Sequence, residues 1–272
     1  MYRQRFGLTS HPLPKNATGK SFFEKSPGYQ KLKKRFTELS SDPGLGILTS
    51  DPGVGKTAAI RNLCAQLPKP NHLVLYLCDT AVSPLDLYRT LALELGVMPS
   101  HRRSQLWADI KKALLHLVDE RATSPVVIID EAQHLSDKFL MDLSGFLNFA
   151  FDSRDLVTLW LVGLPPLSRL LKMQLHAALA TRIETEVHLD ALDRGTFTAL
   201  LDHALKAAGA TQKLLSEPGE EQLFRASRGV PRQASKILRT ALRRAHEKDQ
   251  NFVDEAVMEL AIEEILQPAG AV

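Results

Sequence analysis

The sequence predicts an α/β fold in which a parallel sheet is followed by a small all-helical region. Apolar runs of strand length alternate with helical segments through the first two-thirds of the chain, which is typical of parallel strands joined by crossover helices. After Leu192 the strand-like runs stop and only helical patterns remain. With 272 residues and 44% hydrophobic content, the chain can bury one good core and a smaller second one.

The expected strands and helices alternate as far as residue 189. Each expected strand is a short apolar run, and each intervening segment is long enough for a helix. The expected strands are Leu45–Thr49, Leu73–Cys78, Val126–Asp130, Leu156–Val162 and Thr185–Leu189, and the helices between them are Thr57–Leu67, Pro84–Leu95, Gln105–Arg121, Asp137–Phe149 and Pro166–Leu175.

The C-terminal helices are bounded by the stop and start signals of helix ends, such as Gly209 and Gly229–Pro231. We expect two domains, at residues 1–190 and 191–267, with a frayed tail at 268–272. Residues 1–24 have no period, and we expect them to dock on the sheet through Phe6, Leu8 and Leu13. The expected helices are Arg194–Gly209, Glu217–Arg228, Pro231–Glu247 and Val253–Leu266.

Composition favours a soluble, cytoplasmic protein. The longest apolar stretches, such as Leu156–Val162, are far shorter than the roughly 20 residues needed to cross a bilayer. The N-terminus does not open into the apolar core of a signal peptide. A net charge of +3 is too small to prove a nucleic-acid partner. The spacing of Arg232, Lys236, Arg239 and Arg243 aligns them on one helix face, which is either solvated or a surface for phosphate or an acidic partner.

The segment Ser50–Thr57 follows an apolar strand and fits a phosphate-binding loop. Backbone N–H groups hold a polyphosphate, and a Gly-rich turn brings enough of them together. We expect Lys56 to reach the β- and γ-phosphates and assist catalysis, and the Thr57 hydroxyl to bind Mg²⁺. Ser50 stands where the pattern begins with Gly, so we interpret the segment as a variant loop in which the serine has an extended or a bridging conformation. The expected nucleotide-binding residues are Asp51, Pro52, Gly53, Val54, Gly55, Lys56, Thr57 and Ala58.

The run Val126–Glu131 is apolar and β-branched until it ends in two carboxylates, as expected of a buried central strand. Asp130 would hold Mg²⁺ at the carboxyl edge of the sheet, and Glu131 would orient and activate the attacking water. The two motifs together predict an ATPase. They are far more specific together than either is alone.

The segments Asp51–Thr57, Ile128–Leu135 and Gly229–Arg232 together resemble the AAA+ ATPases. Within them, they resemble the branch of the transposition regulators TnsC and TniB and the secretion ATPase ExeA. The similarity covers most of the chain. It implies an AAA+ P-loop NTPase fold, with a five-stranded sheet in the order 5-1-4-3-2 and a helical lid. It also implies that nucleotide binds between lid and sheet, and that copies assemble into rings or filaments.

The resemblance assigns roles to two arginines. Arg182, just before the fifth strand, is similar to the arginine finger that acts on a neighbouring subunit's γ-phosphate. Arg232 matches the sensor 2 arginine, which contacts the phosphates in cis. Each would otherwise be an exposed or capping arginine. The polar sensor 1 residue is missing, because Gly163 is followed by Leu164 and Thr158 lies too early in its strand. Either another side chain replaces it or hydrolysis is slow and depends on assembly.

Three functions are compatible with this resemblance. The first is an ATP-dependent regulator of transposition that oligomerises on duplex DNA and recruits a transposase, with a target-selection protein as a further partner. The second is an ExeA-like secretion ATPase; such proteins continue into a transmembrane helix, and the chain ends soon after its lid, so we expect the first function and no membrane. The third is a scaffold that binds nucleotide with little hydrolysis.

The candidate DNA contacts lie around residue 102. Arg102 and Arg103 are expected on a loop, with Lys111 on the next helix, in a segment where similar regulators carry pore-facing elements. Cations without interleaved aromatic residues suit sequence-independent contacts to the backbone of duplex DNA. The alternative is an exposed, solvated loop.

Overall fold

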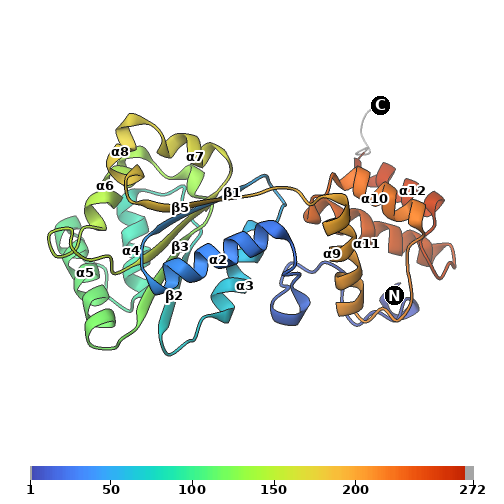
Figure 1. The fold of residues 1–272 in the computed structure, drawn as a ribbon, viewed down its shortest axis with the longest axis horizontal. Coiled ribbons are helices and arrows are strands. Elements are labelled where there is room, and N and C mark those ends of the chain that lie inside the picture. The colour runs from blue at the N-terminus through green and yellow to red at the C-terminus, as the bar shows by residue number, and fades with distance from the viewer. Residues whose placement is uncertain (1, 267–272) are drawn as a thin grey trace. The chain divides into compact units, whose positions relative to one another are not determined.

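The computed structural model describes residues 2–266 and contains the expected parallel sheet (Figure 1). Its order, β2-β3-β4-β1-β5, is the predicted order 5-1-4-3-2 read from the other edge, and every pairing is parallel. The expected tail at 268–272 lies outside the described residues. The strands are β1 (Leu45–Ser50), β2 (His72–Leu77), β3 (Ser124–Ile129), β4 (Thr158–Gly163) and β5 (Ile183–Leu189).

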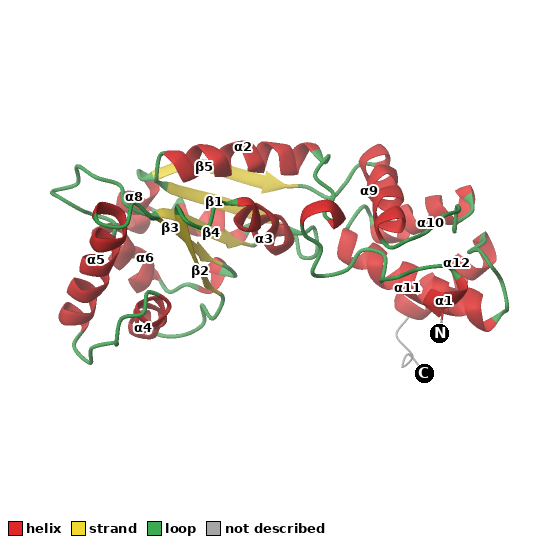
Figure 2. Cartoon of the chain, turned by 90° about the horizontal axis from the view of Figure 1, so that it is seen from below, coloured by secondary structure: helices red, strands yellow, loops and turns green. Residues whose placement is uncertain are grey.

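The described residues form two compact units, which we call the sheet unit and the helical unit. The sheet unit comprises residues 30–51 and 63–189, and the helical unit comprises the described part of 1–29, 52–62 and 190–272. Figure 2 shows the strands of the sheet with helices on both faces. The longer helices up to residue 189 are α2 (Pro27–Ser41), α3 (Lys56–Gln66), α4 (Pro84–Glu94), α5 (Arg103–Asp119), α6 (Asp137–Phe146) and α7 (Pro166–Leu171).

The two faces of the sheet are covered by different helices. Alternate strand residues, among them Ile47 and Ile129, form one core with the apolar faces of α4, α5 and α6. On the other face, Phe36 of α2 stacks on Trp160 of β4 with ring centroids 5.8 Å apart. Strands buried on both faces are typical of a parallel sheet with crossover helices.

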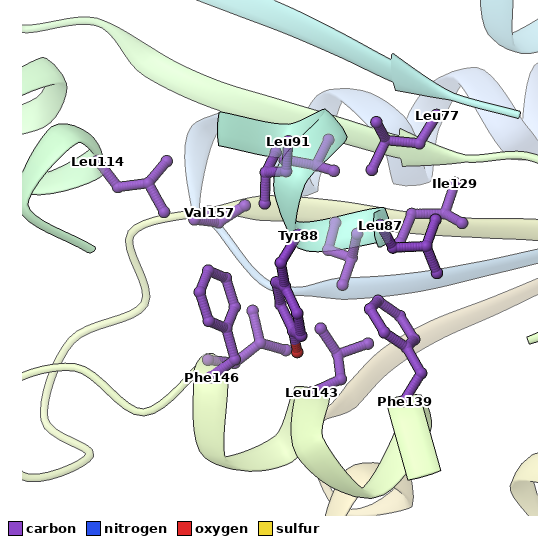
Figure 3. Close-up of a pocket in the computed structure, with 13 residues that line it drawn as sticks. Leu77, Leu87, Tyr88, Leu91, Leu114, Ile129, Phe139, Leu143, Phe146 and Val157 are labelled. Atoms are coloured by element: carbon purple, nitrogen blue, oxygen red, sulfur yellow. The ribbon is translucent and has the colours of Figure 1, made fainter. Parts of the chain in front are cut away.

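The core between the sheet and helices α4 and α6 contains a packing defect. The ring of Tyr88 lies between Phe146 on one side and Leu143 and Phe139 on the other (Figure 3). A cavity of about 20 Å³ adjoins it and is lined by apolar side chains. The Tyr88 hydroxyl is buried and has no hydrogen-bond partner among the described residues, and burial raises its pKa. An unpaired buried hydroxyl destabilises the fold.

Tyr88→Phe is therefore expected to raise the free energy of unfolding by about 1 kcal/mol, because it removes a polar atom without changing the packed ring. Tyr29→Phe is the matched control, and it is expected to lower the free energy of unfolding. The Tyr29 hydroxyl accepts a 2.7 Å hydrogen bond from the buried Asn62 amide, so its loss costs about 1 kcal/mol. Urea unfolding of both variants measures the difference, and equal destabilisation by both contradicts the expectation.

The helical unit has its own apolar core. The N-terminal residues Phe6 and Leu8 pack in this core, and Leu13 packs against it, instead of docking on the sheet as expected. Thr9 holds the segment in place by donating its backbone N–H to the Ala208 carbonyl at 2.8 Å. The helices of the unit are α1 (Tyr2–Arg5), α9 (Arg194–Ala207), α10 (Glu217–Ser227), α11 (Pro231–Glu247) and α12 (Glu255–Leu266).

Between residues 2 and 266, no helix combines the length and the apolar character that a bilayer span requires.

Candidate nucleotide-binding site

The phosphate loop starts at the carboxyl edge of the sheet. Ser50 is the last residue of β1, where it is buried and lies in register with Leu189 of β5. Its backbone is therefore extended, and its hydroxyl donates to the Asp51 carbonyl at 2.9 Å. A strand residue needs no positive φ, which explains why a serine is accommodated where the pattern has glycine.

The loop itself depends on two glycines. Gly53 has φ 88° and Gly55 has φ 122°, conformations that side chains rarely adopt. A Cβ on Gly55 would meet no atom of the described residues within 4 Å, so this side of the turn has room for a phosphate. Lys56 is buried and begins α3, whose first turn holds no acidic residue. A helix N-terminus without acidic residues favours an anion, and these residues therefore fit a bound polyphosphate.

Arg232 lies against this loop within the helical unit. Its backbone N–H donates to the Gly53 carbonyl at 3.2 Å, and its side chain is exposed. A Cβ on Gly53 would come within 2.9 Å of the Arg232 Cβ and 3.0 Å of Val230 Cγ1. The glycine thus permits close packing of the start of α11 on the loop, which puts Arg232 beside the residues predicted to hold phosphate.

Asp130 follows β3 at the carboxyl edge where β1 also ends, because both strands run parallel. Its carboxylate is buried and already oriented by two donors. The Glu131 backbone N–H donates to Oδ1 and the Tyr76 hydroxyl to Oδ2, both at 2.9 Å. Burial and the Asp130 carboxylate raise the pKa of Tyr76. Sequence reasoning missed Tyr76, although it stands on the strand next to β3.

Glu131 has a left-handed backbone, with φ 53°. This conformation is uncommon for a residue with a side chain and tends to occur at functional sites. Thr80 supports it by donating its hydroxyl to the Glu131 carbonyl at 2.9 Å. The Glu131 side chain is exposed, and Gln133 Nε2 donates to its Oε2 at 2.7 Å. Sequence reasoning also missed Thr80 and Gln133.

The end of β4 contains no side chain that could take the sensor 1 position. The Thr158 hydroxyl donates to the Leu39 carbonyl at 2.6 Å and is buried at the start of the strand. Leu164 has an apolar side chain, but its backbone N–H donates to Gln133 Oε1 at 2.9 Å. A side chain from another segment therefore provides the polar contact at this strand end.

Arg182 precedes β5 at the opposite edge of the sheet from Ser50 and Asp130. The seven residues of β5 separate these edges by roughly 20 Å at the rise of a strand. β5 is also the outermost strand of the sheet. The Arg182 guanidinium forms an ion pair with Asp152, and 22% of its side chain is exposed. Arg182 therefore lies far from the Asp130 edge of its own sheet.

The three candidate DNA-binding residues have different surroundings. Arg102 is exposed at the N-cap of α5, and Arg103 is the first residue of that helix instead of a loop residue. Arg103 pairs with Asp142 at 2.7 Å and lies 4.4 Å from the ring centre of Trp107. Lys111 donates to the Asn148 carbonyl at 2.7 Å, and burial lowers its pKa. Of the three, Arg102 has an exposed side chain that makes no such contact within residues 2–266.

Comparison with known proteins finds similarity over the segments that contain these residues. Residues 38–171 match the model of an AAA domain, a span that contains the phosphate loop and both acidic residues. The chain is 28% identical over 267 residues to general secretion pathway protein A of Aeromonas hydrophila. That alignment covers 97% of this chain and 48% of the relative, so the chain spans about half the length of the relative.

Solved structures show the same fold at low sequence identity. The ORC2 protein of Aeropyrum pernix, in its ADPNP–ADP complexes, matches with a TM-score of 0.72 and 14% identity, over 98% of this chain and 74% of that one. Drosophila ORC bound to DNA gives 0.73 and 15%, over 98% and 66%. The Thermotoga maritima RuvB Holliday junction branch migration motor gives 0.62 and 16%, over 92% and 72%.

Proposed function

We propose that this protein, with its AAA domain and the fold of AAA+ ATPases, binds ATP with Mg²⁺ and hydrolyses it at a site completed by a second copy. The supporting observation is the placement of Arg182 and Asp130 at opposite edges of one sheet. An arginine roughly 20 Å from its own acidic residues suits a neighbour's site better than its own.

In this proposal each polar residue has one task. Lys56 and the loop N–H groups hold the β- and γ-phosphates, while Thr57 and Asp130 hold Mg²⁺, which supplies charge neutralisation. Glu131 accepts a proton from the water whose oxygen attacks the γ-phosphorus, and the bond to the β–γ bridging oxygen breaks to release ADP. Arg232 contacts the phosphates in cis. Arg182 of the neighbouring copy stabilises the charge on the transferring group.

We further propose duplex DNA and other copies of this chain as partners, with the chain acting as an ATP-dependent regulator of transposition that recruits a transposase. The transposase and a target-selection protein are then its protein partners. Arg102 supports a contact to the DNA backbone, and proteins of this fold include one solved on DNA and one that moves Holliday junctions. The second candidate is a secretion ATPase, favoured by the identity to general secretion pathway protein A.

Phosphate release and electron microscopy, each with and without duplex DNA, separate these functions. A DNA-binding regulator is expected to form ATP-dependent rings or filaments on duplex DNA. ATP hydrolysis with no change on adding DNA favours the secretion-type ATPase, and nucleotide binding without phosphate release under any condition favours a scaffold. A monomer that ignores both ATP and DNA contradicts the whole proposal.

Arg102→Ala is expected to weaken duplex DNA binding at moderate salt several-fold and to reduce its salt dependence. With one phosphate contact fewer, binding of the variant releases fewer counterions from the DNA. ATP affinity is expected to remain unchanged. Arg121→Ala is the matched control, because Arg121 is exposed just beyond the other end of α5. Arg103→Ala is a poorer probe, since it also removes the ion pair with Asp142. Equal DNA affinities for both single variants, measured by fluorescence anisotropy, refute the assignment.

A further inference from the structure

We propose that Gln133 is a positioning residue that links the end of β4 to the Glu131 carboxylate. It thereby provides the polar contact that the apolar side chain of Leu164 cannot make. This inference rests on the proposed hydrolysis of ATP, in which Glu131 activates the attacking water. It assigns no chemistry to Gln133 itself.

Both ends of the Gln133 amide are used. Nε2 donates to Glu131 Oε2 at 2.7 Å, and Oε1 accepts from the Leu164 backbone N–H at 2.9 Å. The reversed amide would face a donor with a donor and an acceptor with an acceptor, so these two partners fix its orientation. A single side chain that both donates and accepts therefore bridges β4 and the acidic residue.

Gly163 makes room for this bridge. A Cβ at Gly163 would lie 2.5 Å from Gln133 Oε1 and 3.3 Å from the Gln133 backbone nitrogen. Gly163 is not among the glycines with positive φ, so its backbone conformation does not require a glycine. The absence of a side chain at the last residue of β4 is thus explained by the space that the Gln133 amide occupies.

The Glu131 backbone is held independently of Gln133. Its carbonyl accepts from Thr80 and its N–H donates to Asp130. With the backbone held, the carboxylate retains rotation about its side-chain bonds, and the Gln133 contact limits that rotation. A shift at the end of β4 would then move the amide and, with it, the carboxylate that orients water.

The test uses two substitutions that break the same bridge from different sides. Gln133→Leu removes both hydrogen bonds at similar volume. Gly163→Ala retains the Gln133 and Glu131 side chains but displaces the Oε1 atom of Gln133. Each is expected to lower kcat for ATP hydrolysis by about 10-fold to 10²-fold, as misplacement of a catalytic group does. The KM for ATP and the affinity for a fluorescent ATP analogue are expected to change less than about twofold, because Glu131 does not bind the nucleotide in the ground state.

The double variant distinguishes a bridge from two separate structural losses. If Gly163 acts by housing Gln133, the double variant is no slower than Gln133→Leu alone, whereas independent defects multiply. Gln133→Glu retains an acceptor for the Leu164 N–H but places a second carboxylate against Glu131, so it is expected to lower kcat at least as much. Gln105→Leu is the control, since Gln105 makes a single exposed contact to Asp109.

Amide hydrogen exchange gives a readout that does not depend on hydrolysis. The Leu164 N–H is expected to exchange faster in Gln133→Leu and in Glu131→Ala, while the central β3 amides stay protected. Wild-type kcat and wild-type exchange at Leu164 in Gln133→Leu overturn the inference and leave the proposed ATPase intact. If the wild type releases no more phosphate than Glu131→Gln, the proposed hydrolysis fails and the inference fails with it.

Discussion

Glu131→Gln is expected to abolish steady-state ATP hydrolysis, with a loss of about 10²-fold to 10⁴-fold in kcat, while ATP binding is retained. An amide of the same size cannot accept the proton of the attacking water, and general-base catalysis contributes a factor of that order. The loop, Lys56 and Thr57 remain unchanged, so the ground-state contacts to ATP are preserved. Phosphate release measures hydrolysis, and a fluorescent ATP analogue measures affinity.

Glu94→Gln is the matched control for this variant, because Glu94 is an exposed carboxylate at the end of α4, in the same unit as Glu131. It is expected to keep wild-type turnover. A Glu131→Gln protein that hydrolyses ATP at the wild-type rate would exclude Glu131 as the base. Loss of ATP binding in the same variant would instead place Glu131 in the binding contacts.

Arg182→Ala is expected to lower kcat by roughly 10³-fold to 10⁵-fold, the contribution of an arginine finger in nucleotide triphosphatases that use one. Affinity for ATP in the isolated subunit is expected to stay constant, because Arg182 stands at the far edge of its own sheet. The loss is therefore expected only under conditions in which copies assemble.

Two controls separate this role from a structural one. Asp152→Ala removes the ion pair of Arg182 without removing the guanidinium, and it is expected to change kcat by less than about fivefold, because partly exposed pairs contribute little to stability. Arg169→Ala removes an exposed arginine of α7 and is expected to have no effect. Equal losses in Arg182→Ala and Asp152→Ala would indicate that the ion pair, and not a finger, is what matters.

Local patterns were sufficient to predict the sheet. All five strands lie within a few residues of their expected positions, because short apolar runs bounded by loops carry their own signal. Helix α2 was missed, although Tyr29, Leu32, Phe36 and Leu39 repeat at helical spacing and are buried. The apolar residues of the N-terminal segment did not reveal which core they enter. Phe6 and Leu8 pack with the helical unit. Their sequence pattern could not show this, because the hydrophobic effect is non-directional and favours burial in either core.

The candidate site also has residues that local sequence patterns predict and residues that they do not. The phosphate loop and the Asp130–Glu131 pair could be predicted because contiguous residues carry their chemistry. The roles of Tyr76, Thr80 and Gln133 depend on hydrogen bonds between segments that only the folded sheet brings together. Gly163 was the available signal for Gln133, since a glycine without positive φ at a strand end indicates a close neighbour.

Mixing two inactive variants tests most directly whether the site is shared between copies. Arg182→Ala retains a complete loop and acidic pair, and Lys56→Ala retains Arg182, so each lacks a different part. If Arg182 acts in trans, an assembled mixture regains up to about one quarter of wild-type phosphate release, because sites pairing an intact loop with an intact arginine re-form at random interfaces. A mixture as inactive as either variant, although both variants enter the same oligomers, contradicts the shared site.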